Sequence, residues 1–135
     1  EKHLWEKIYK KSGQGRRTGV GITAEGDMLA AMGLRYGTEE ATEFSEQVHK
    51  TIALEAYRSS VNMAKERGAF AIYDSEREKN NPFINRLKEA DPELYEEMKK
   101  YGRRNIDLPD HSSHRNYQPN DPNYFRHRAG VYAGV

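Results

Sequence analysis

Cysteine is absent from this chain of 135 residues. Its absence excludes disulfides, thiolate metal sites, cysteine nucleophiles and thiol redox chemistry within the chain. Long apolar runs are missing too, since no stretch approaches the roughly 18 residues of a membrane span and no secretory hydrophobic region is visible. We therefore expect a cytoplasmic protein that does not bind or enter a membrane.

An excess of one charge is also missing, because 22 Lys and Arg balance 21 Asp and Glu to a formal net charge of +1. So small a charge produces no strong field toward nucleic acid or anionic lipid. Hydrophobic residues make up only 36% of the chain and charged residues 32%, which is polar for a self-sufficient globule of this length. We expect a modest helical core with further apolar surface buried against something else. The first residue, Glu1 rather than Met, favours a chain processed or excised from a longer one.

The sequence predicts a mainly α protein with one long central helix over residues 38–67. Thr38 is the expected N-cap, and Gly68 fits the left-handed position after the last turn. A helix of about 30 residues would be about 45 Å long, more than a domain of this size readily covers. Its expected apolar face is Ala41, Phe44, Val48, Ile52, Ala56 and Met63, widened by Leu54, Tyr57, Val61 and Ala64.

Shorter amphipathic helices are predicted on both sides of the long one. The first carries Leu4, Trp5 and Ile8 at helical spacing, and three residues are expected to end it: Ser12, Gly13 and Gly15. After a brief strand or extended turn over residues 18–22, Thr23 is the expected N-cap of a second helix. The apolar face of that helix would be Met28, Leu29 and Met32.

Two Asx-Pro pairs predict the helices that follow, because proline suits the first helical position. Asn81-Pro82 would start a helix whose inward residues are Phe83, Ile84 and Leu87. Asp91-Pro92 would start another, with Leu94, Tyr95 and Met98 inward and Gly102 at its end. Residues 69–73 are expected to form a docked apolar loop, and residues 103–106 to enter a strand.

The composition changes after residue 106, where prolines and Asn/Asp turn signals replace helical periodicity. We therefore divide the chain into a helical segment over residues 1–106 and a divergent, irregular tail over residues 107–135.

The sequence GRRTGVG at residues 15–21 is the best candidate for a binding turn. An anion contact by Arg16, Arg17, Gly19 and Gly21 ahead of a helix is one interpretation. Tight backbone packing at a corner is the favoured alternative, because the third glycine is misplaced for a dinucleotide fingerprint and the Walker Gly-Lys-Ser/Thr ending is absent.

Other polar clusters favour structural roles. The tail holds residue types that bind zinc, namely Asp107, Asp110, His111, His114 and His127, but their spacing fits no known metal frame. We expect no catalytic, cofactor-binding or metal-binding residue in the chain.

Aromatic residues and arginines alternate in the tail, a pattern that can stack on single-stranded bases. Acidic residues cancel those arginines, so nucleic-acid binding is disfavoured and packing onto a protein is favoured. His49 is expected to be a surface or half-buried structural histidine, with no carboxylate–nucleophile pair nearby to organise it. The carboxylates of Glu93, Glu96 and Glu97 are expected on a solvated helix face.

Several segments, taken in order, resemble the large catalytic subunit of ribonucleotide reductases. They are RTGVGITAEGDML at residues 17–29, LRYGTEEA, the helix through Leu54-Glu55-Ala56, MAKERGA at residues 63–69, and Tyr101-Gly102-Arg103-Arg104-Asn105. The resemblance covers about residues 4–106 and is closest to the adenosylcobalamin-dependent branch, although the metal-radical branch shares the pattern.

The resemblance implies an interior segment of a ten-stranded α/β barrel that makes deoxyribonucleotides by thiyl-radical chemistry. It implies adenosylcobalamin for the parent enzyme but no cofactor in this chain, because the family's catalytic cysteines lie elsewhere. The expected partner is the rest of the reductase barrel or a complementary chain, and nucleotide would bind only through the parent enzyme. The family's phosphate loop after its Arg-Asn pair is missing here, since Ile106 continues into Asp107-Leu108-Pro109.

The alternative function is a stand-alone helical interaction module that uses its Tyr/Arg-rich tail to bind a protein partner.

Overall fold

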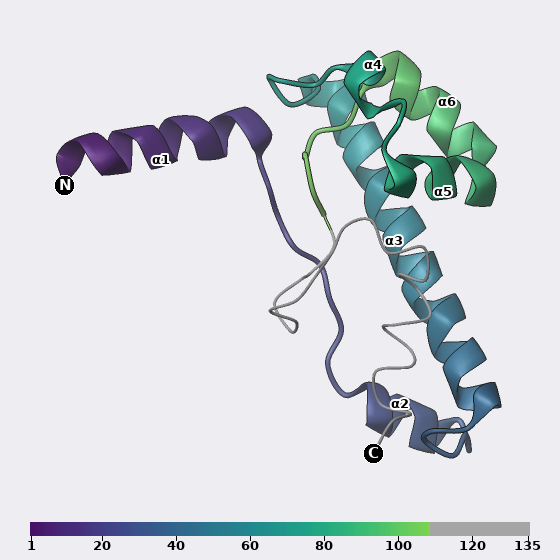
Figure 1. Cartoon of the computed structure of the whole chain (residues 1–135). Coiled ribbons are helices and arrows are strands. Elements are labelled where there is room, and N and C mark those ends of the chain that lie inside the picture. The colour runs from purple at the N-terminus through teal and green to yellow at the C-terminus, as the bar shows by residue number, and fades with distance from the viewer. Residues whose placement is uncertain (109–135) are drawn as a thin grey trace.

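The computed structural model describes residues 1–108, and within them the chain is helical without a regular strand (Figure 1). Its elements, in order, are α1 (Lys2–Gly15), α2 (Glu25–Ala31), α3 (Glu39–Arg67), α4 (Ser75–Glu78), α5 (Pro82–Ala90) and α6 (Pro92–Tyr101). The prediction of a mainly α chain with one long central helix is confirmed.

Local capping fixes both ends of α3, as the sequence predicts. The Thr38 side chain accepts a hydrogen bond from the Ala41 amide at 3.3 Å. At the other end Gly68 has φ 79° and ψ 157°, a positive-φ conformation that favours glycine but differs from the left-handed helical geometry expected. The basic Lys65 and Arg67 lie in the last turn, where the helix dipole favours them.

The core lies around the C-terminal half of α3, where α5 and α6 pack on it and α4 lies beside them (Figure 1). Asn81 and Asp91 cap α5 and α6 through their side chains, each followed by proline in the first turn, as predicted. The core cluster contains Tyr57, Val61, Phe83, Ile84, Leu87, Leu94, Met98 and Leu108.

The loop before α4 docks onto this core as expected. Phe70 is buried, and its amide donates to the Arg103 carbonyl at 3.0 Å. Gly102 ends α6 with φ 72°, and a Cβ atom placed there would lie 2.6 Å from the Ala69 Cβ. The loop can therefore approach α6 this closely only because residue 102 is glycine.

The N-terminal helix α1 projects away from the rest of the molecule (Figure 1). Of the three residues expected to end it, Gly15 is the last helical residue, whereas Ser12 and Gly13 lie within the helix, and Arg16 closes it in the left-handed conformation. An interior glycine costs only about 1 kcal/mol, which the helix tolerates. Gly15 itself packs on Ile106, at a distance of 3.1 Å from a hypothetical Cβ to the Ile106 Cγ2.

Helix α2 lies against the N-terminal half of α3, at the end remote from α5 and α6 (Figure 1). The expected N-cap Thr23 is wrong by one position, since Ala24 occupies it with φ 60° and without a side-chain cap. The apolar face of α2 is confirmed in part, with Leu29 buried and Met32 59% exposed.

The face that α3 buries differs from the predicted stripe in its N-terminal half. Ala41 is buried as expected, but Ser45 and His49 follow it, whereas Phe44 and Val48 are only half-buried. The stripe shifts because α2 covers the side of α3 that carries the two polar residues.

Residues 103–108 are extended and lie beside residues 15–20, although they form no regular strand. The Ile106 amide donates to the Gly15 carbonyl at 2.9 Å, the Thr18 amide to Asp107 at 3.1 Å, and the Val20 amide to Leu108 at 2.9 Å. The expected strand at residues 103–106 is therefore absent from the described chain, and the extended alternative for residues 18–22 holds. Leu108 is buried in the core cluster.

Candidate functional site

The candidate anion-binding residues lie where the chain passes from α1 toward α2. Arg16 is half-buried, and its carbonyl accepts a hydrogen bond from the Asn105 side chain at 2.9 Å. The Arg17 side chain is 73% exposed and lies 3.9 Å from the Asp107 carboxylate. Gly19 and Gly21 are exposed in the extended segment that follows. The geometry brings Arg16 and Arg17 to residues 105–107, and the anion contact stays a prediction.

The most organised polar group is one that the sequence did not single out as a site. The Arg103 side chain is 3% exposed, and its guanidinium forms a two-pronged ion pair with Glu78 from α4. The same group donates to the carbonyls of Asn105 at 3.0 Å and Ile106 at 3.1 Å. One buried cation therefore joins α4 to the extended segment that leaves α6.

Three aromatic rings surround this ion pair. The guanidinium carbon lies 5.4 Å from the ring centre of Phe70, 5.8 Å from that of Tyr57 and 5.9 Å from that of Tyr73. Burial raises the pKa of the Tyr73 phenol, the Glu78 carboxylate raises it further, and Arg103 opposes both. The phenol stays protonated at neutral pH and donates to the Met98 carbonyl at 2.9 Å.

Ser60 and Asn105 form a second polar junction beside the first. The Ser60 hydroxyl donates to the Asn105 side-chain oxygen at 2.9 Å and accepts from the amides of Arg104 and Asn105, both at 3.1 Å. Arg104 in turn donates to the carbonyl of Arg67, the last residue of α3, and to that of Gly68, which follows it. The YGRRN motif thus fixes the end of α1, the end of α3 and the extended segment to one another.

A third polar group joins α2 to α3. The Glu25 carboxylate accepts a hydrogen bond from Ser45 and lies 3.4 Å from the His49 Nε2. The expected surface or half-buried position of His49 is wrong, because the side chain is buried where α2 brings Glu25 onto this face of α3. Ser45 points its hydroxyl at the carboxylate rather than at His49, so the arrangement holds two helices together and does not form a nucleophile–base pair.

The carboxylates of α6 belong to its surface. Glu97 pairs with Lys65 of α3 at 2.7 Å, and Glu93 and Glu96 are exposed. Within residues 1–108 no group of three or more His, Asp or Glu side chains is placed to hold a metal ion. Of the zinc candidates only Asp107 is described; Asp110, His111, His114 and His127 lie outside the described residues, as do the aromatic and arginine residues of the tail.

A small cleft of about 80 Å³ lies beside Tyr73 and Glu78, between α4 and α6. Pockets for drug-sized ligands have volumes of roughly 300–1,000 Å³, so this cleft cannot hold a corrin ring or a nucleotide. Its walls come from both helices, and Lys79 and Lys99 contribute to them. In the described part of the chain no helix has the length and apolar character needed to span a bilayer.

Comparison with known families gives this arrangement a context. A family model described as "Ribonucleotide reductase, barrel domain" matches residues 2–108. The chain belongs to the ribonucleotide reductase barrel-domain family. The matched region contains α1 to α6 and ends at Leu108, which is also the last described residue.

Named reductases are among its relatives. The chain is 39% identical over 75 residues to the vitamin B12-dependent ribonucleoside-diphosphate reductase of Thermoplasma acidophilum, covering 55% of this chain and 10% of the relative. It is 35% identical over 62 residues to the enzyme of the same name from Mycobacterium tuberculosis, covering 46% and 9%. It is 38% identical over 58 residues to a ribonucleoside-diphosphate reductase subunit alpha of Chlamydia pneumoniae, covering 43% and 6%.

The match spans a tenth or less of the length of these curated relatives. The resemblance to a reductase large subunit is thereby confirmed, as is the assignment of the helices to its barrel domain. Two of the three relatives are named vitamin B12-dependent. The polar junctions around Arg103, Ser60 and Glu25 are therefore features of a barrel-domain segment.

Proposed function

We propose that this chain is a helical segment of a ribonucleotide reductase catalytic subunit and cannot reduce ribonucleotides by itself. The barrel-domain match over residues 2–108 carries this proposal. The absence of cysteine supports it, because thiyl-radical chemistry requires thiols that this chain does not have. The chain would act by packing against the remainder of the barrel that carries the chemistry.

Exposed apolar side chains support a packing role. The largest are Leu4, Trp5, Ile8, Tyr9, Val20, Ile22, Met32, Tyr36, Ile72 and Tyr101. A free-standing domain scatters such residues singly, whereas α1 alone presents four of them within two turns.

The parent enzyme would use adenosylcobalamin, as the names of two relatives suggest. When bound, this cofactor would supply the radical that starts ribonucleotide reduction. The cleft beside Tyr73 is too small for a corrin, and we assign the cofactor and the nucleotide to other parts of the parent enzyme. We expect that enzyme in the cytoplasm.

Complementation tests the proposal directly. The full chain would be produced together with the Thermoplasma acidophilum reductase from which the 75 matched residues have been deleted. We expect the two polypeptides to co-purify and to form deoxyribonucleotides when adenosylcobalamin is added. The chain alone should form none.

The matched control is Leu94→Asp, which places a carboxylate at a core position of 0% exposure. This variant should neither co-purify nor restore activity. Deoxyribonucleotide formation by the isolated chain, or no association of the intact chain with the deleted reductase, would contradict the proposal.

A further inference from the structure

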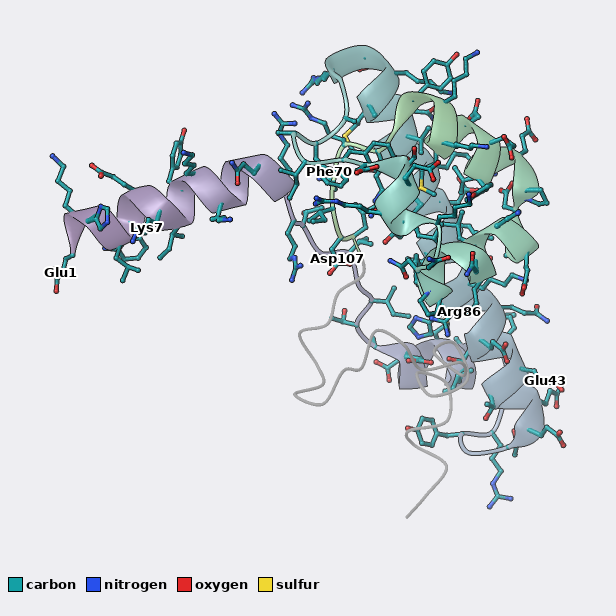
Figure 2. The ribbon with its side chains drawn as sticks, turned by 45° about the horizontal axis from the view of Figure 1, so that its top comes forward. Glu1, Lys7, Glu43, Phe70, Arg86 and Asp107 are labelled. Carbon is teal, nitrogen blue, oxygen red and sulfur yellow. The ribbon has the colours of Figure 1, made fainter. Side chains whose placement is uncertain are left out.

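Three arginines from distant parts of the chain gather where α1, α3 and α6 end. Arg16 follows α1, Arg67 is the last residue of α3, and Arg104 lies just beyond α6. We call these three residues the arginine cluster. Helix α1 joins the body at the end that carries Phe70, remote from Glu43 (Figure 2).

Hydrogen bonds between the three segments build the cluster. One guanidinium nitrogen of Arg104 donates to the carbonyls of Arg67 and Gly68, at 2.7 and 3.0 Å. The side chain of the next residue, Asn105, donates to the Arg16 carbonyl at 2.9 Å. The end of α1 therefore lies beside the segment that follows α6, and that segment lies against the end of α3 (Figure 1).

The charges of the cluster repel one another. Burial lowers the pKa of the Arg104 guanidinium, and the positive charges of Arg16 and Arg67 lower it further. Within residues 1–108 none of the three arginines forms an ion pair with a carboxylate. Glu66 is exposed and adjacent to Arg67 in the sequence, and it too forms no ion pair in this part of the chain.

Most hydrogen-bond donors of the cluster are also unused. An arginine carries five N–H donors in a fixed planar arrangement. Among the described residues, the guanidinium groups of Arg16 and Arg67 donate to no acceptor, and Arg104 donates through one of its nitrogens only. Three cations with unused donors at one surface favour an acceptor that carries more than one negative charge.

A phosphate group suits this cluster better than a carboxylate does. Near neutral pH a phosphate monoester carries a charge of about −1.5 to −2 and has three strong acceptor oxygens. A carboxylate has a single charge and two oxygens, so it can bind fewer guanidinium groups. Guanidinium groups also bind phosphate oxygens through pairs of parallel hydrogen bonds.

We propose that Arg16, Arg67 and Arg104 form a binding site for a phosphate group, either the free ion or the phosphate of a small ester. The bound phosphate neutralises the cluster and joins the end of α1 to the end of α3. Arg17 lies outside the site, beside Asp107. This site is a property of the chain alone and does not depend on the proposed function.

Calorimetric titration of the full chain with inorganic phosphate tests the proposal, with chloride holding the ionic strength constant. We expect saturable binding of a single phosphate per chain, and a higher unfolding temperature when phosphate replaces chloride. A chain that responds equally to phosphate and chloride would overturn the proposal.

Adenosine monophosphate distinguishes the two sources of phosphate. Binding of both the nucleotide and inorganic phosphate would support a site that accepts phosphate esters, whereas binding of inorganic phosphate alone would support a site for the free ion. Adenosine without phosphate should not bind. Binding of the nucleotide without binding of inorganic phosphate would overturn the proposal, because the nucleoside would then be the group recognised.

The variants Arg16→Gln and Arg67→Gln locate the site, while Arg104 keeps its contacts with the end of α3. Each variant should weaken phosphate binding at least about tenfold, because charge-assisted hydrogen bonds are lost. The rise in unfolding temperature that phosphate causes should disappear as well. Arg67 is exposed, so its variant should fold as the wild-type chain does.

The matched control is Arg35→Gln, which removes the same charge from the loop before α3, at the opposite end of that helix. Arg35 is exposed, and its substitution should leave the phosphate dissociation constant within about twofold of the wild-type value. Equal weakening by Arg35→Gln, or undiminished binding by both cluster variants, would overturn the proposal.

Discussion

The guanidinium of Arg103 donates two hydrogen bonds to the carboxylate of Glu78, and the Arg103 side chain is only 3% exposed. The two residues are 25 positions apart in the chain, and their pairing connects α4 to the segment that follows α6. Three carbonyl or carboxylate groups and three aromatic rings share this one cation. The stability of this end of the fold should therefore depend on it.

Replacing Arg103 with Met should lower the free energy of unfolding by about 3 kcal/mol, because it leaves the mostly buried Glu78 carboxylate without a counter-charge. The double variant Arg103→Met/Glu78→Leu should lose less, since no uncompensated charge remains. Arg77→Ala is the control: its side chain is 84% exposed beside Asp74, and its loss should cost about 0.5 kcal/mol or less. Urea denaturation measures all three. Equal effects of the Arg103 and Arg77 variants would refute the role of the buried pair.

Substituting Gly102 with Ala should destabilise the fold by about 2 kcal/mol or more. Two costs add there, because φ is 72° and the new Cβ would lie 2.6 Å from the Ala69 Cβ. The variant Gly33→Ala separates the cost of the backbone conformation from the steric cost. Gly33 has φ 74°, but nothing lies within 4 Å of a Cβ placed there. Its cost should be about 1 kcal/mol. Thermal unfolding of both variants provides the comparison, and a Gly33 variant as unstable as the Gly102 variant would exclude a steric contribution.

Stability should decline in strongly alkaline solution through the titration of Tyr73. Its pKa is raised above the usual value of 10 by burial and by Glu78. The unfolded chain therefore loses this proton first, and the stability present below pH 10 is lost as the pH rises toward the folded pKa. The phenolate absorbance, followed with increasing pH, should contain a late component that Tyr73→Phe removes.

That variant also loses the hydrogen bond to the Met98 carbonyl, at a cost of about 1 kcal/mol that does not depend on pH below the titration. Tyr9→Phe is the control, because Tyr9 is 84% exposed. A late component that survives in Tyr73→Phe would assign the titration to another tyrosine.

Removing the Glu25 carboxylate should loosen α2. The variant Glu25→Ala leaves the Ser45 hydroxyl and the His49 ring without this partner on the buried face of α3, a loss of about 1–3 kcal/mol. Hydrogen exchange of the α2 amides should accelerate while that of α6 is unchanged. The control is Asp27→Ala. Asp27 is the other acidic residue in the first turn of α2 and is exposed, so its loss should leave the hydrogen exchange of the α2 amides nearly unchanged. Faster exchange in α6 as well would indicate global rather than local destabilisation.

The sequence was sufficient for the helices whose ends are defined locally. Thr38, Asn81 and Asp91 each cap a helix through a side-chain oxygen two or three residues from the amide that it binds. Such contacts depend only on neighbouring residues, so they can be read from the order of the amino acids. The same is true of the inward positions of α5 and α6, where a single apolar face leaves one way to pack.

The polar junctions could not be predicted in this way. In the sequence Arg103 and His49 look like surface residues. In the fold each is buried and contacts a carboxylate from another helix, Glu78 of α4 and Glu25 of α2 respectively. The candidate anion-binding residues were identified as a local motif, but only the fold shows that Arg16 bonds to Asn105, 89 positions later.

The sequence by itself therefore determined α3, α5 and α6, their N-caps and the family, because these depend on local spacing and on ordered motifs. Only the tertiary structure decided which face of α3 is buried and where Arg103 finds its partner. A wide apolar face permits several packings, and the choice between Phe44 and Ser45 is made when Glu25 of α2 satisfies the polar residues. Burial of a charge or a hydroxyl depends on a partner that folding brings from a distant part of the chain.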